Sequence, residues 1–197
     1  MVTQLPGFYY SQMNKNIEGM VIEIDKELEL RQLEQNDSFR IFELIDAQRE
    51  YLGEWLPFVA FTQTVADSEQ FVNCVINAPE EHFEYVFSIR KNNNFIGLIG
   101  FKDTDNQNRK TEMGYWLSER HQKQGIVTRC VDKLCQFAFN ELEMNRVQIR
   151  CAVGNAPSAN IPKRLGFSFE GIERDGELLS GNRFVDLEVY SKLKSDL

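Results

Sequence analysis

The stretch from Thr111 to Phe139 constrains the fold of this chain more than any other, because it joins a strand pattern, a short polar loop and a helix pattern. Met113, Tyr115 and Leu117 alternate with the residues between them, which is the period of a β-strand. The first amides of a helix have no partner inside it, so this unit predicts an anion-binding site in front of Gly125. After this glycine, apolar residues recur at the spacing of one helical face: Val127, Val131, Leu134, Ala138 and Leu142.

Two common phosphate-binding loops do not match this stretch. A nucleotide P-loop requires G-x-x-x-x-G-K-S/T, and a dinucleotide fold requires G-x-G-x-x-G after a strand. Gly125 stands alone in its loop, with Gln122 three residues before it. On the residues alone, the segment is either the start of an ordinary helix or a phosphate site of another kind.

Length and composition favour one globular domain. The chain has 197 residues, of which 42% are hydrophobic and 26% are charged. We expect a single domain over residues 20–197, preceded by an extension at residues 1–19 that shows no clear period. The net charge of −8 argues against direct binding of nucleic acid, which requires a basic surface, and is compatible with a cationic amine as substrate.

The sequence also predicts no membrane span, no signal peptide and no metal site. No window approaches the roughly 18 apolar residues of a membrane helix, and the N-terminus lacks a charged-then-apolar pattern. The four Cys form no C-x-x-C pair, and only two His are available as metal ligands. We therefore expect reduced thiols in a cytoplasmic protein.

The periodic segments follow the order β-α-α-β-β-β-α-β-α-β-β. A strand–helix–strand crossover in the middle requires a parallel pair, while the flanking hairpins are antiparallel, so the predicted class is α/β (α+β) with a mixed sheet. An Asn-rich turn at 91–94 predicts a tight hairpin. The predicted strands are 20–33 (with a possible turn or bulge at Asp25-Lys26), 84–90, 95–102, a segment from 111, 146–153, 167–174 and 184–193, with a final turn at 175–182. Four helices are predicted, beginning at residue 36 or 37, at 67, after 125 and at 155. The first of them is expected to end at Gly53 and to carry an apolar face of Phe39, Phe42 and Ile45.

The loop pattern Gln122-x-x-Gly125-x-Val127 resembles the Q/R-x-x-G-x-G/A loop of the GNAT (GCN5-related) N-acetyltransferases, and the predicted order of elements is theirs over about residues 20–193. Val127 departs from the pattern, since the family usually has glycine or alanine there. Its amide can still donate if the side chain points into the protein. The resemblance implies acetyl-CoA as cosubstrate, with its pyrophosphate held by the amides of Gln122, Lys123, Gln124, Gly125, Ile126, Val127 and Thr128.

A second motif, Asn155-x-x-Ser158 followed by Leu165-Gly166-Phe167, resembles the segment after the fifth strand in the same family. The RimJ/RimL-type branch of ribosomal-protein N-terminal acetyltransferases is still more similar. This resemblance rests on Trp55-Leu56-Pro57, Gly114-Tyr115-Trp116, Leu142-x-x-Asn145-Arg146 and Gly176-Glu177-x-x-x-Gly181.

The resemblance to this branch implies transfer of an acetyl group to the N-terminal α-amine of a (ribosomal) protein, by direct attack in a ternary complex. One alternative is an acetyltransferase of a small amine, such as a polyamine, an amino sugar or an amino acid. The other is a non-catalytic CoA-binding module, which only Val127 favours. Acetyl-CoA and the acceptor are the predicted partners, and a homodimer is an assembly that the sequence leaves open.

The resemblance also implies roles near the acyl group. Backbone groups near Trp116 and Leu117 would pair with the pantetheine arm of acetyl-CoA. Asn155 would bond the pantetheine amide, or only cap the helix that follows it. Ser158 would protonate the departing thiolate, or serve only as a residue of the helix start, where serine is common.

On the acceptor side, the resemblance offers Glu177 as general base, and the alternative is an exposed carboxylate in a turn. Trp55 and Tyr115 are candidates for the substrate wall, although Trp55 could instead serve in packing. A covalent route through Cys130 or Cys135 is the remaining mechanistic alternative. Both lie on a helix dominated by packing, and no His is paired with them in the sequence.

Overall fold

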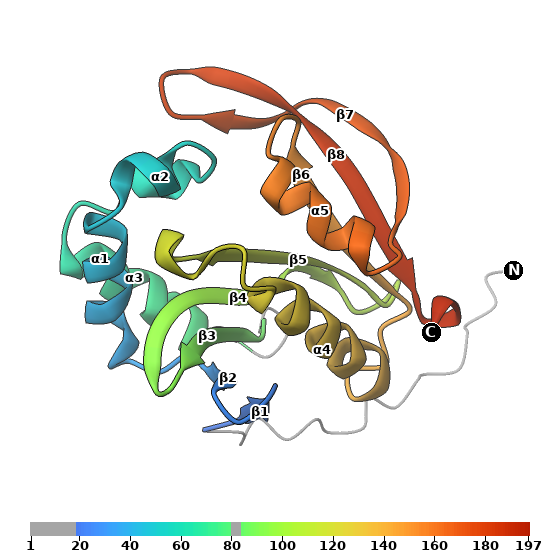
Figure 1. Cartoon of the computed structure of the whole chain (residues 1–197), viewed down its shortest axis with the longest axis horizontal. Coiled ribbons are helices and arrows are strands. Elements are labelled where there is room, and N and C mark those ends of the chain that lie inside the picture. The colour runs from blue at the N-terminus through green and yellow to red at the C-terminus, as the bar shows by residue number, and fades with distance from the viewer. Residues whose placement is uncertain (1–18, 80–83) are drawn as a thin grey trace, which may run out of the picture.

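The computed structural model describes residues 19–79 and 84–197, so most of the predicted extension at 1–19 lies outside the described residues. The described chain forms a mixed eight-stranded sheet in the order β1-β2-β3-β4-β5-β6-β8-β7, with helices on both of its faces (Figure 1). The predicted mixed α/β class is confirmed. The strands are β1 Val21–Glu23, β2 Leu28–Gln32, β3 Val86–Lys91, β4 Asn94–Asp105, β5 Lys110–Leu117, β6 Arg146–Ala152, β7 Ser168–Leu179 and β8 Arg183–Leu193. The helices are α1 Asp37–Asp46, α2 Arg49–Gly53, η1 Pro57–Ala60, α3 Val65–Ile76, η3 Glu119–His121, α4 Ile126–Asn140, α5 Ala156–Arg164 and η4 Lys194–Asp196.

The predicted strand over residues 20–33 is instead a hairpin of β1 and β2. The amides of Ile24 and Asp25 both donate to the carbonyl oxygen of Leu28, at 2.9 and 3.1 Å. The side chain of Asp25 accepts a further hydrogen bond from the amide of Glu27 at 2.8 Å. The possible turn or bulge predicted at Asp25-Lys26 is confirmed as a turn, because this aspartate bonds the backbone that follows it, as Asp commonly does.

The first predicted helix is broken into α1 and α2. Gln48 leaves the helical region with φ −144° and ψ 35°, and its side-chain amide donates to the carbonyl oxygen of Leu44 at 3.0 Å. The predicted apolar face was also wrong at Phe39, which is 53% exposed. Ile41 and Ile45, one turn apart, form the buried face instead.

The last hairpin has a shorter turn than predicted. β7 continues to Leu179, and Glu177 pairs with Val185 of β8. Gly181 and Asn182, with φ of 76° and 59°, close the turn in the left-handed region. Glu177 is therefore a strand residue, which excludes the alternative of an exposed turn carboxylate.

The β3–β4 hairpin is confirmed at the Asn-rich turn. Asn92 and Asn93 adopt φ of 49° and 64°, the pair of left-handed residues that a tight hairpin requires and that asparagine tolerates. On its other edge, β4 pairs with β5, from Gly97 opposite Leu117 to Lys102 opposite Glu112.

β5 and β6, the predicted parallel pair, diverge after a short pairing, and we call the region between their separated ends the cleft. Their pairing runs only from Lys110 opposite Arg146 to Glu112 opposite Gln148. β5 continues along β4 to Leu117, and β6 continues along β8 to Ala152. The two strands therefore diverge beyond Glu112, as Figure 1 shows.

Two hydrophobic clusters hold the sheet and position the site. Helix α4 packs one face of the sheet through a stripe that includes Val131, Leu134 and Ala138, all fully buried. On the other face, α1 and α3 bury Ile45 and Val72 in a second cluster. From β2 to β5, the sheet is therefore covered by α4 on one face and by α1 and α3 on the other. The cleft begins beyond β5, where helices no longer cover both faces.

Candidate active site

The loop before α4 has the backbone of an anion site. Gly125 precedes the helix with φ 69°, a left-handed conformation that strains residues with a Cβ. Arg129 is the first residue of α4 whose amide bonds back along the chain, to the carbonyl oxygen of Gly125. From Lys123 to Thr128, no backbone amide has a backbone acceptor within the described part of the chain. These amides can therefore bind an anion, helped by the positive end of the helix.

Val127 does not obstruct this loop. Its side chain is half-buried and packs against the main hydrophobic cluster, together with the fully buried Ile126. The amide of Val127 is consequently left for a ligand. A valine in place of glycine or alanine therefore changes the packing under the loop and preserves the backbone N–H as a hydrogen-bond donor.

Glutamine side chains fasten the loop to neighbouring elements. The amide of Gln122 donates to the hydroxyl of Tyr51 in α2, and the side-chain oxygen of Gln124 accepts from the ammonium of Lys91 at 3.0 Å. Gln48 also accepts a hydrogen bond from the amide of Glu119, at 2.8 Å. No pattern in the sequence indicates the contributions of Gln48 and Tyr51, since both residues lie far from the loop along the chain.

His121 adds no charge to the loop at neutral pH. Partial burial, reinforced by the positive charges of Lys91 and Arg120, lowers the pKa of its imidazole below the usual 6.5. A neutral imidazole can donate or accept one hydrogen bond at each nitrogen. Of the charged groups beside it, Lys91 and Arg120 are the ones that can attract an anion.

A cluster of three polar side chains lies where β5 and β6 have separated. The hydroxyl oxygens of Ser158 and Tyr115 are 3.2 Å apart, and the Ser158 hydroxyl donates to the sulfur of Cys151 at 3.2 Å. The Tyr115 hydroxyl also lies 3.3 Å from the carbonyl oxygen of Ser158. Burial holds the pKa of Tyr115 well above its usual 10 and raises the pKa of Cys151 to about 11. All three groups therefore keep their protons at neutral pH.

Asn155 positions Ser158 by capping α5. Its side-chain oxygen accepts a hydrogen bond from the amide of Ser158 at 3.2 Å. The capping role foreseen for this asparagine is thus observed, and it occupies the side-chain oxygen. The NH₂ group of Asn155 has no protein partner in the described residues, and it is the half of the side chain that could serve a ligand.

A cavity of about 380 Å³ lies on the side of the sheet that α1 and α3 cover. Its walls are largely apolar, with Ile41, Phe58 and Phe71 from the helices and Trp116 from β5. Gly114 belongs to the wall as well. A Cβ at this glycine would meet only the side chain of Lys102, at 3.8 Å, so the missing side chain leaves room in the cavity.

Glu177 enters the same cavity from β7, on the other side of the cleft. Burial raises the pKa of its carboxyl above the usual 4.5, against the opposing effect of the positive Lys102 and Arg150. The negative charge of Glu112 adds to the rise. A carboxyl with a raised pKa is a stronger base than an exposed one and is closer to the range used in proton transfer.

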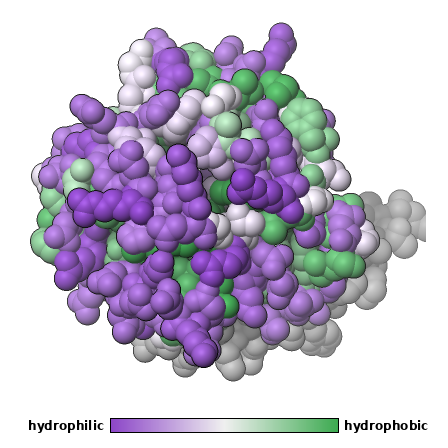
Figure 2. All heavy atoms as spheres, in the orientation of Figure 1, coloured by the Kyte–Doolittle hydropathy of each residue, from purple (hydrophilic) through white to green (hydrophobic). Residues whose placement is uncertain are grey.

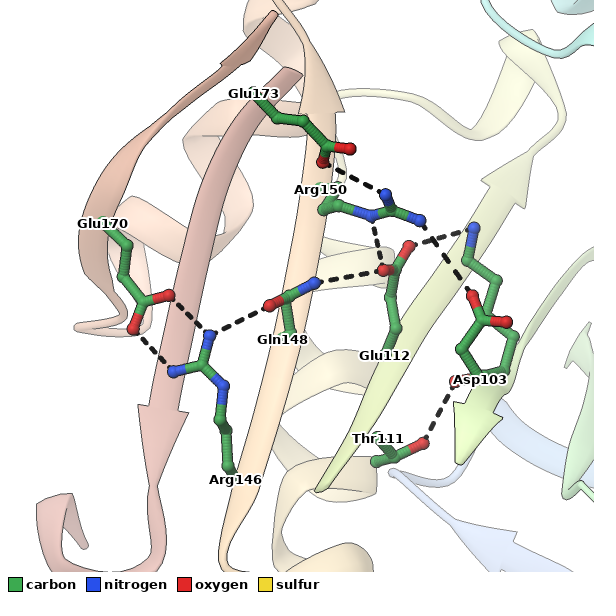
Figure 3. A network of polar contacts seen from close by, with 9 residues as sticks. Asp103, Thr111, Glu112, Arg146, Gln148, Arg150, Glu170 and Glu173 are labelled. Atoms are coloured by element: carbon green, nitrogen blue, oxygen red, sulfur yellow. Dashed lines mark hydrogen bonds and ion pairs between the residues drawn. The ribbon is translucent and has the colours of Figure 1, made fainter. Parts of the chain in front are cut away.

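A network of charged side chains fixes the point at which the cleft begins (Figure 3). The carboxylate of Glu112, 6% exposed, is bonded to the ammonium of Lys102 at 2.9 Å and to the guanidinium of Arg150 at 2.5 Å. Gln148 donates to the same carboxylate at 3.3 Å, and Arg150 reaches Glu173 of β7 at 3.2 Å. One buried carboxylate therefore ties β4, β5 and β6 together at their last shared register position.

Two contacts bridge the far end of the cleft. The ring of Trp55 lies beside Gly154, at 3.7 Å from where a Cβ would stand, and the guanidinium of Arg183 donates to the carbonyl oxygen of Glu54 at 3.3 Å. In Figure 2 this side of the molecule is mainly hydrophilic, with a hollow near its centre that shows hydrophobic atoms. Trp55 is not among the residues of the cavity wall, whereas Tyr115 and Glu177 are.

Cys130 and Cys135 are placed for packing. Both are buried in α4, and burial raises the pKa of each thiol to about 12. No group of three or more His, Cys, Asp or Glu side chains in residues 19–79 and 84–197 is arranged to hold a metal ion. Within the same residues, no helix is long and apolar enough to cross a membrane.

Comparisons with known proteins identify relatives across most of the chain. A family profile described as "Acetyltransferase (GNAT) domain" matches residues 27–168. The chain is 35% identical over 180 residues to "Putative ribosomal N-acetyltransferase YdaF" of Bacillus subtilis, covering 88% of this chain and 94% of that protein. It is 28% identical over 172 residues to "Ribosomal-protein-serine acetyltransferase" of Escherichia coli, covering 87% and 96%.

A solved structure shares the fold. It is a ribosomal alpha-N-protein acetyltransferase (RimL) in complex with coenzyme A, and it superposes with a TM-score of 0.85 at 22% identity. The match covers 90% of this chain and all of the other. The two chains therefore share the overall fold.

Proposed function

The chain belongs to the GNAT acetyltransferase family and is an acetyl-CoA-dependent N-acetyltransferase, and we propose that its acceptor is the N-terminal α-amine of a ribosomal protein. The names of the Bacillus subtilis and Escherichia coli relatives support this acceptor. The predicted resemblance to the family, and to its ribosomal-protein branch, is confirmed by these relatives.

One observation carries the assignment of the site. Tyr115 belongs to the wall of the cavity that contains Glu177, and its hydroxyl bonds to Ser158 in the cleft. The cavity for an acceptor and the cleft for a donor therefore meet at one residue of β5. Such a meeting point is what direct transfer between two bound substrates requires.

For the donor, acetyl-CoA supplies an acetyl thioester and a pyrophosphate. The free amides from Lys123 to Thr128 bind the pyrophosphate at the positive end of α4. The backbone amide of Gln122, the first of the predicted set, already donates to the carbonyl oxygen of Glu119 at 3.1 Å. The NH₂ group of Asn155 bonds the pantetheine arm. The backbone groups of Leu117 lie along the edge of β5 that β6 leaves unpaired, whereas the carbonyl oxygen of Trp116 lies against Gly97 of β4. A backbone amide on this edge can also stabilise the oxyanion of the transition state.

For the acceptor, Glu177 takes the proton of the amine, directly or through one water. A protein α-amine has a pKa of about 7.7–8.0 and a lysine amine about 10.4, so a modest base is enough for an N-terminus. Burial gives Glu177 a raised pKa, which suits this role. The carboxyl therefore favours an α-amine over a lysine amine at neutral pH.

Ser158 returns a proton to the departing thiolate. Its hydroxyl is 3.2 Å from that of Tyr115, which burial keeps protonated. A proton given up by Ser158 can be replaced from Tyr115 across this hydrogen bond. Direct attack needs no cysteine nucleophile, in agreement with the strongly raised pKa of Cys130 and Cys135.

Release of free CoA in the presence of different acceptors tests the proposal. The panel contains peptides with free Ser or Ala at the N-terminus, a lysine peptide with a blocked N-terminus, and polyamines. We expect turnover with the free N-termini alone. Turnover with the polyamines alone would assign the function to a small amine, and binding of acetyl-CoA without any turnover would favour a non-catalytic module.

The proposal also includes a cytoplasmic location and a homodimer. The four cysteines are free, which suits a reducing compartment. On the β7–β8 hairpin, Phe169, Ile172 and Phe184 are about half exposed, and a second copy of the chain would cover apolar side chains of this kind. Light scattering of the purified protein measures the assembly directly.

A further inference from the structure

Lys102 of β4 brings a positive charge into the wall of the cavity that also contains Glu177. Among the described residues that line this cavity, these two are the ones with a charged side chain. The alternation of β4 places Lys102 on the same face of the sheet as Leu98, which is the face that α1 and α3 cover. The lysine side chain crosses β5 at Gly114, where a Cβ would lie 3.8 Å from its Cε. It therefore runs past the residue that precedes Tyr115 in the chain.

The ammonium of Lys102 keeps hydrogen-bond donors for a ligand. Within the described residues it is bonded to the carboxylate of Glu112, at 2.9 Å, and a lysine ammonium has three N–H donors. The same carboxylate is also held by Arg150 at 2.5 Å and by Gln148 at 3.3 Å. The side chain of Lys102 is 48% exposed. A ligand in the cavity can therefore reach the ammonium, and Glu112 retains other partners when it does.

The location of Lys102 relates it to the second residue of an acceptor. The α-amine of the acceptor lies beside Glu177 in the proposed function, and the charge of Glu112 is balanced by Arg150. Wall residues such as Ile41 are buried, whereas Lys102 is half exposed and so lies at the mouth of the cavity. The peptide chain that follows the first residue leaves by this mouth. Its second residue is therefore the one that meets the ammonium.

We propose that Lys102 is a specificity-determining residue, whose ammonium binds the carboxylate of an Asp or Glu at the second position of the acceptor and repels a cation there. The inference rests on the proposed α-amine acceptor and adds the chemical class of the residue that follows the first one. The same repulsion disfavours polyamines, because a second ammonium group of such an acceptor would lie near Lys102. One charge thus selects one class of acceptor and rejects another.

The test is a competition among three peptides that all begin with Ser and have Glu, Gln or Lys as the second residue. Mass spectrometry measures the ratios of the acetylated products. We expect the wild-type protein to favour the Glu peptide over the Gln peptide by about threefold, the effect of one partly exposed ion pair, and to acetylate the Lys peptide most slowly. The net charge of −8 attracts the Lys peptide instead, so this order requires a cation in the site.

Lys102→Gln should bring the three rates close together, whereas Lys102→Arg keeps the charge and should keep the preference. Lys110→Gln is the matched control. Lys110 lies on the neighbouring β5, is about as exposed as Lys102 and pairs with Asp105 at 3.8 Å, but it is not part of the cavity wall. Its substitution should leave the ratios of the three peptides unchanged.

The wild-type protein tests the same inference without any substitution, because added salt screens an exposed ion pair and should reduce the preference for the Glu peptide. Equal wild-type rates for the three peptides, or a preference that neither salt nor Lys102→Gln alters, would overturn the inference and leave the proposed function intact. Failure of the wild-type protein to acetylate any of the three peptides would instead overturn the proposed function, and the inference with it.

Discussion

In the proposed mechanism, the burial of the Glu177 carboxyl favours activity and disfavours stability. Burial raises its pKa in the folded protein above the usual 4.5, so its ionisation opposes folding. The sign follows from linkage: the folded state holds the proton to higher pH, and stability falls as the pH rises from the unfolded value through the raised folded value. The same burial makes the carboxylate a better base.

Glu177→Gln should therefore separate the two effects. We expect kcat for peptide acetylation to fall by about 10²-fold, the usual contribution of a general base. In urea unfolding, the variant should gain stability relative to the wild-type protein at about pH 7 and show little difference at about pH 4. A loss of activity together with a loss of stability at neutral pH would indicate a structural role instead.

At the same scale, the sequence identified Ser158 and Asn155 but not the environment of either. Tyr115 faces the same side of β5 as Met113, and Cys151 faces the same side of β6 as Ile149. Both placements follow from the alternation of side chains along a strand, which can be read from the sequence. Their meeting at Ser158 depends on the divergence of β5 and β6. No local pattern encodes that divergence.

At the scale of elements, the strand–loop–helix unit from Thr111 was predictable because its signals are local. The alternation of β5, the lone Gly125 and the apolar stripe of α4 each depend on a few neighbouring residues. The break at Gln48 and the turn at Asp25 depend on single side chains that bond the backbone. Such bonds compete with regular structure. A turn at Asp25 could be foreseen as a possibility, whereas the apolar period extended the first helix past Gln48.

The backbone of the loop gives a prediction for Gly125. Gly125→Ala meets no atom within 4 Å, so its cost comes from the left-handed φ of 69° alone. We expect a loss of about 1 kcal/mol in the free energy of unfolding and a Kd for acetyl-CoA weakened by roughly five- to tenfold. Isothermal titration calorimetry measures the second effect.

Gly125→Asn is the control for this substitution, because asparagine tolerates the left-handed region better than alanine. It should retain most of the affinity for acetyl-CoA. Equal Kd values for the wild-type, Ala and Asn proteins would mean that the loop conformation does not determine cosubstrate binding.

At the scale of the whole molecule, the cleft is held at both ends. The buried Glu112 and its partners Lys102 and Arg150 fix the end at which β5 and β6 still pair (Figure 3). At the other end, Trp55 beside Gly154 and Arg183 bonded to the carbonyl of Glu54 join the two halves. A ligand between these ends is surrounded by a preformed site, which lowers the entropic cost of binding.

The global architecture followed from the order of the elements, whereas the cavity did not. A crossover between parallel strands and two flanking hairpins lead to a mixed sheet from few rules. The cavity combines α1, η1, α3, β4, β5 and β7, which are far apart in the chain. Trp55 illustrates the limit, since it was a candidate for the substrate wall and lies at the bridge across the cleft.

The central claim is that this cleft transfers an acetyl group from acetyl-CoA to a protein α-amine, with Ser158 as the proton donor. The most direct measurement uses one peptide that carries both a free N-terminus and a single lysine, incubated with acetyl-CoA and protein. Tandem mass spectrometry then locates the acetyl group. We predict acetylation at the N-terminus by the wild-type protein. With Ser158→Ala the rate should fall by about 10²-fold while acetyl-CoA still binds. Acetylation at the lysine, or an unchanged rate in the variant, would contradict the account.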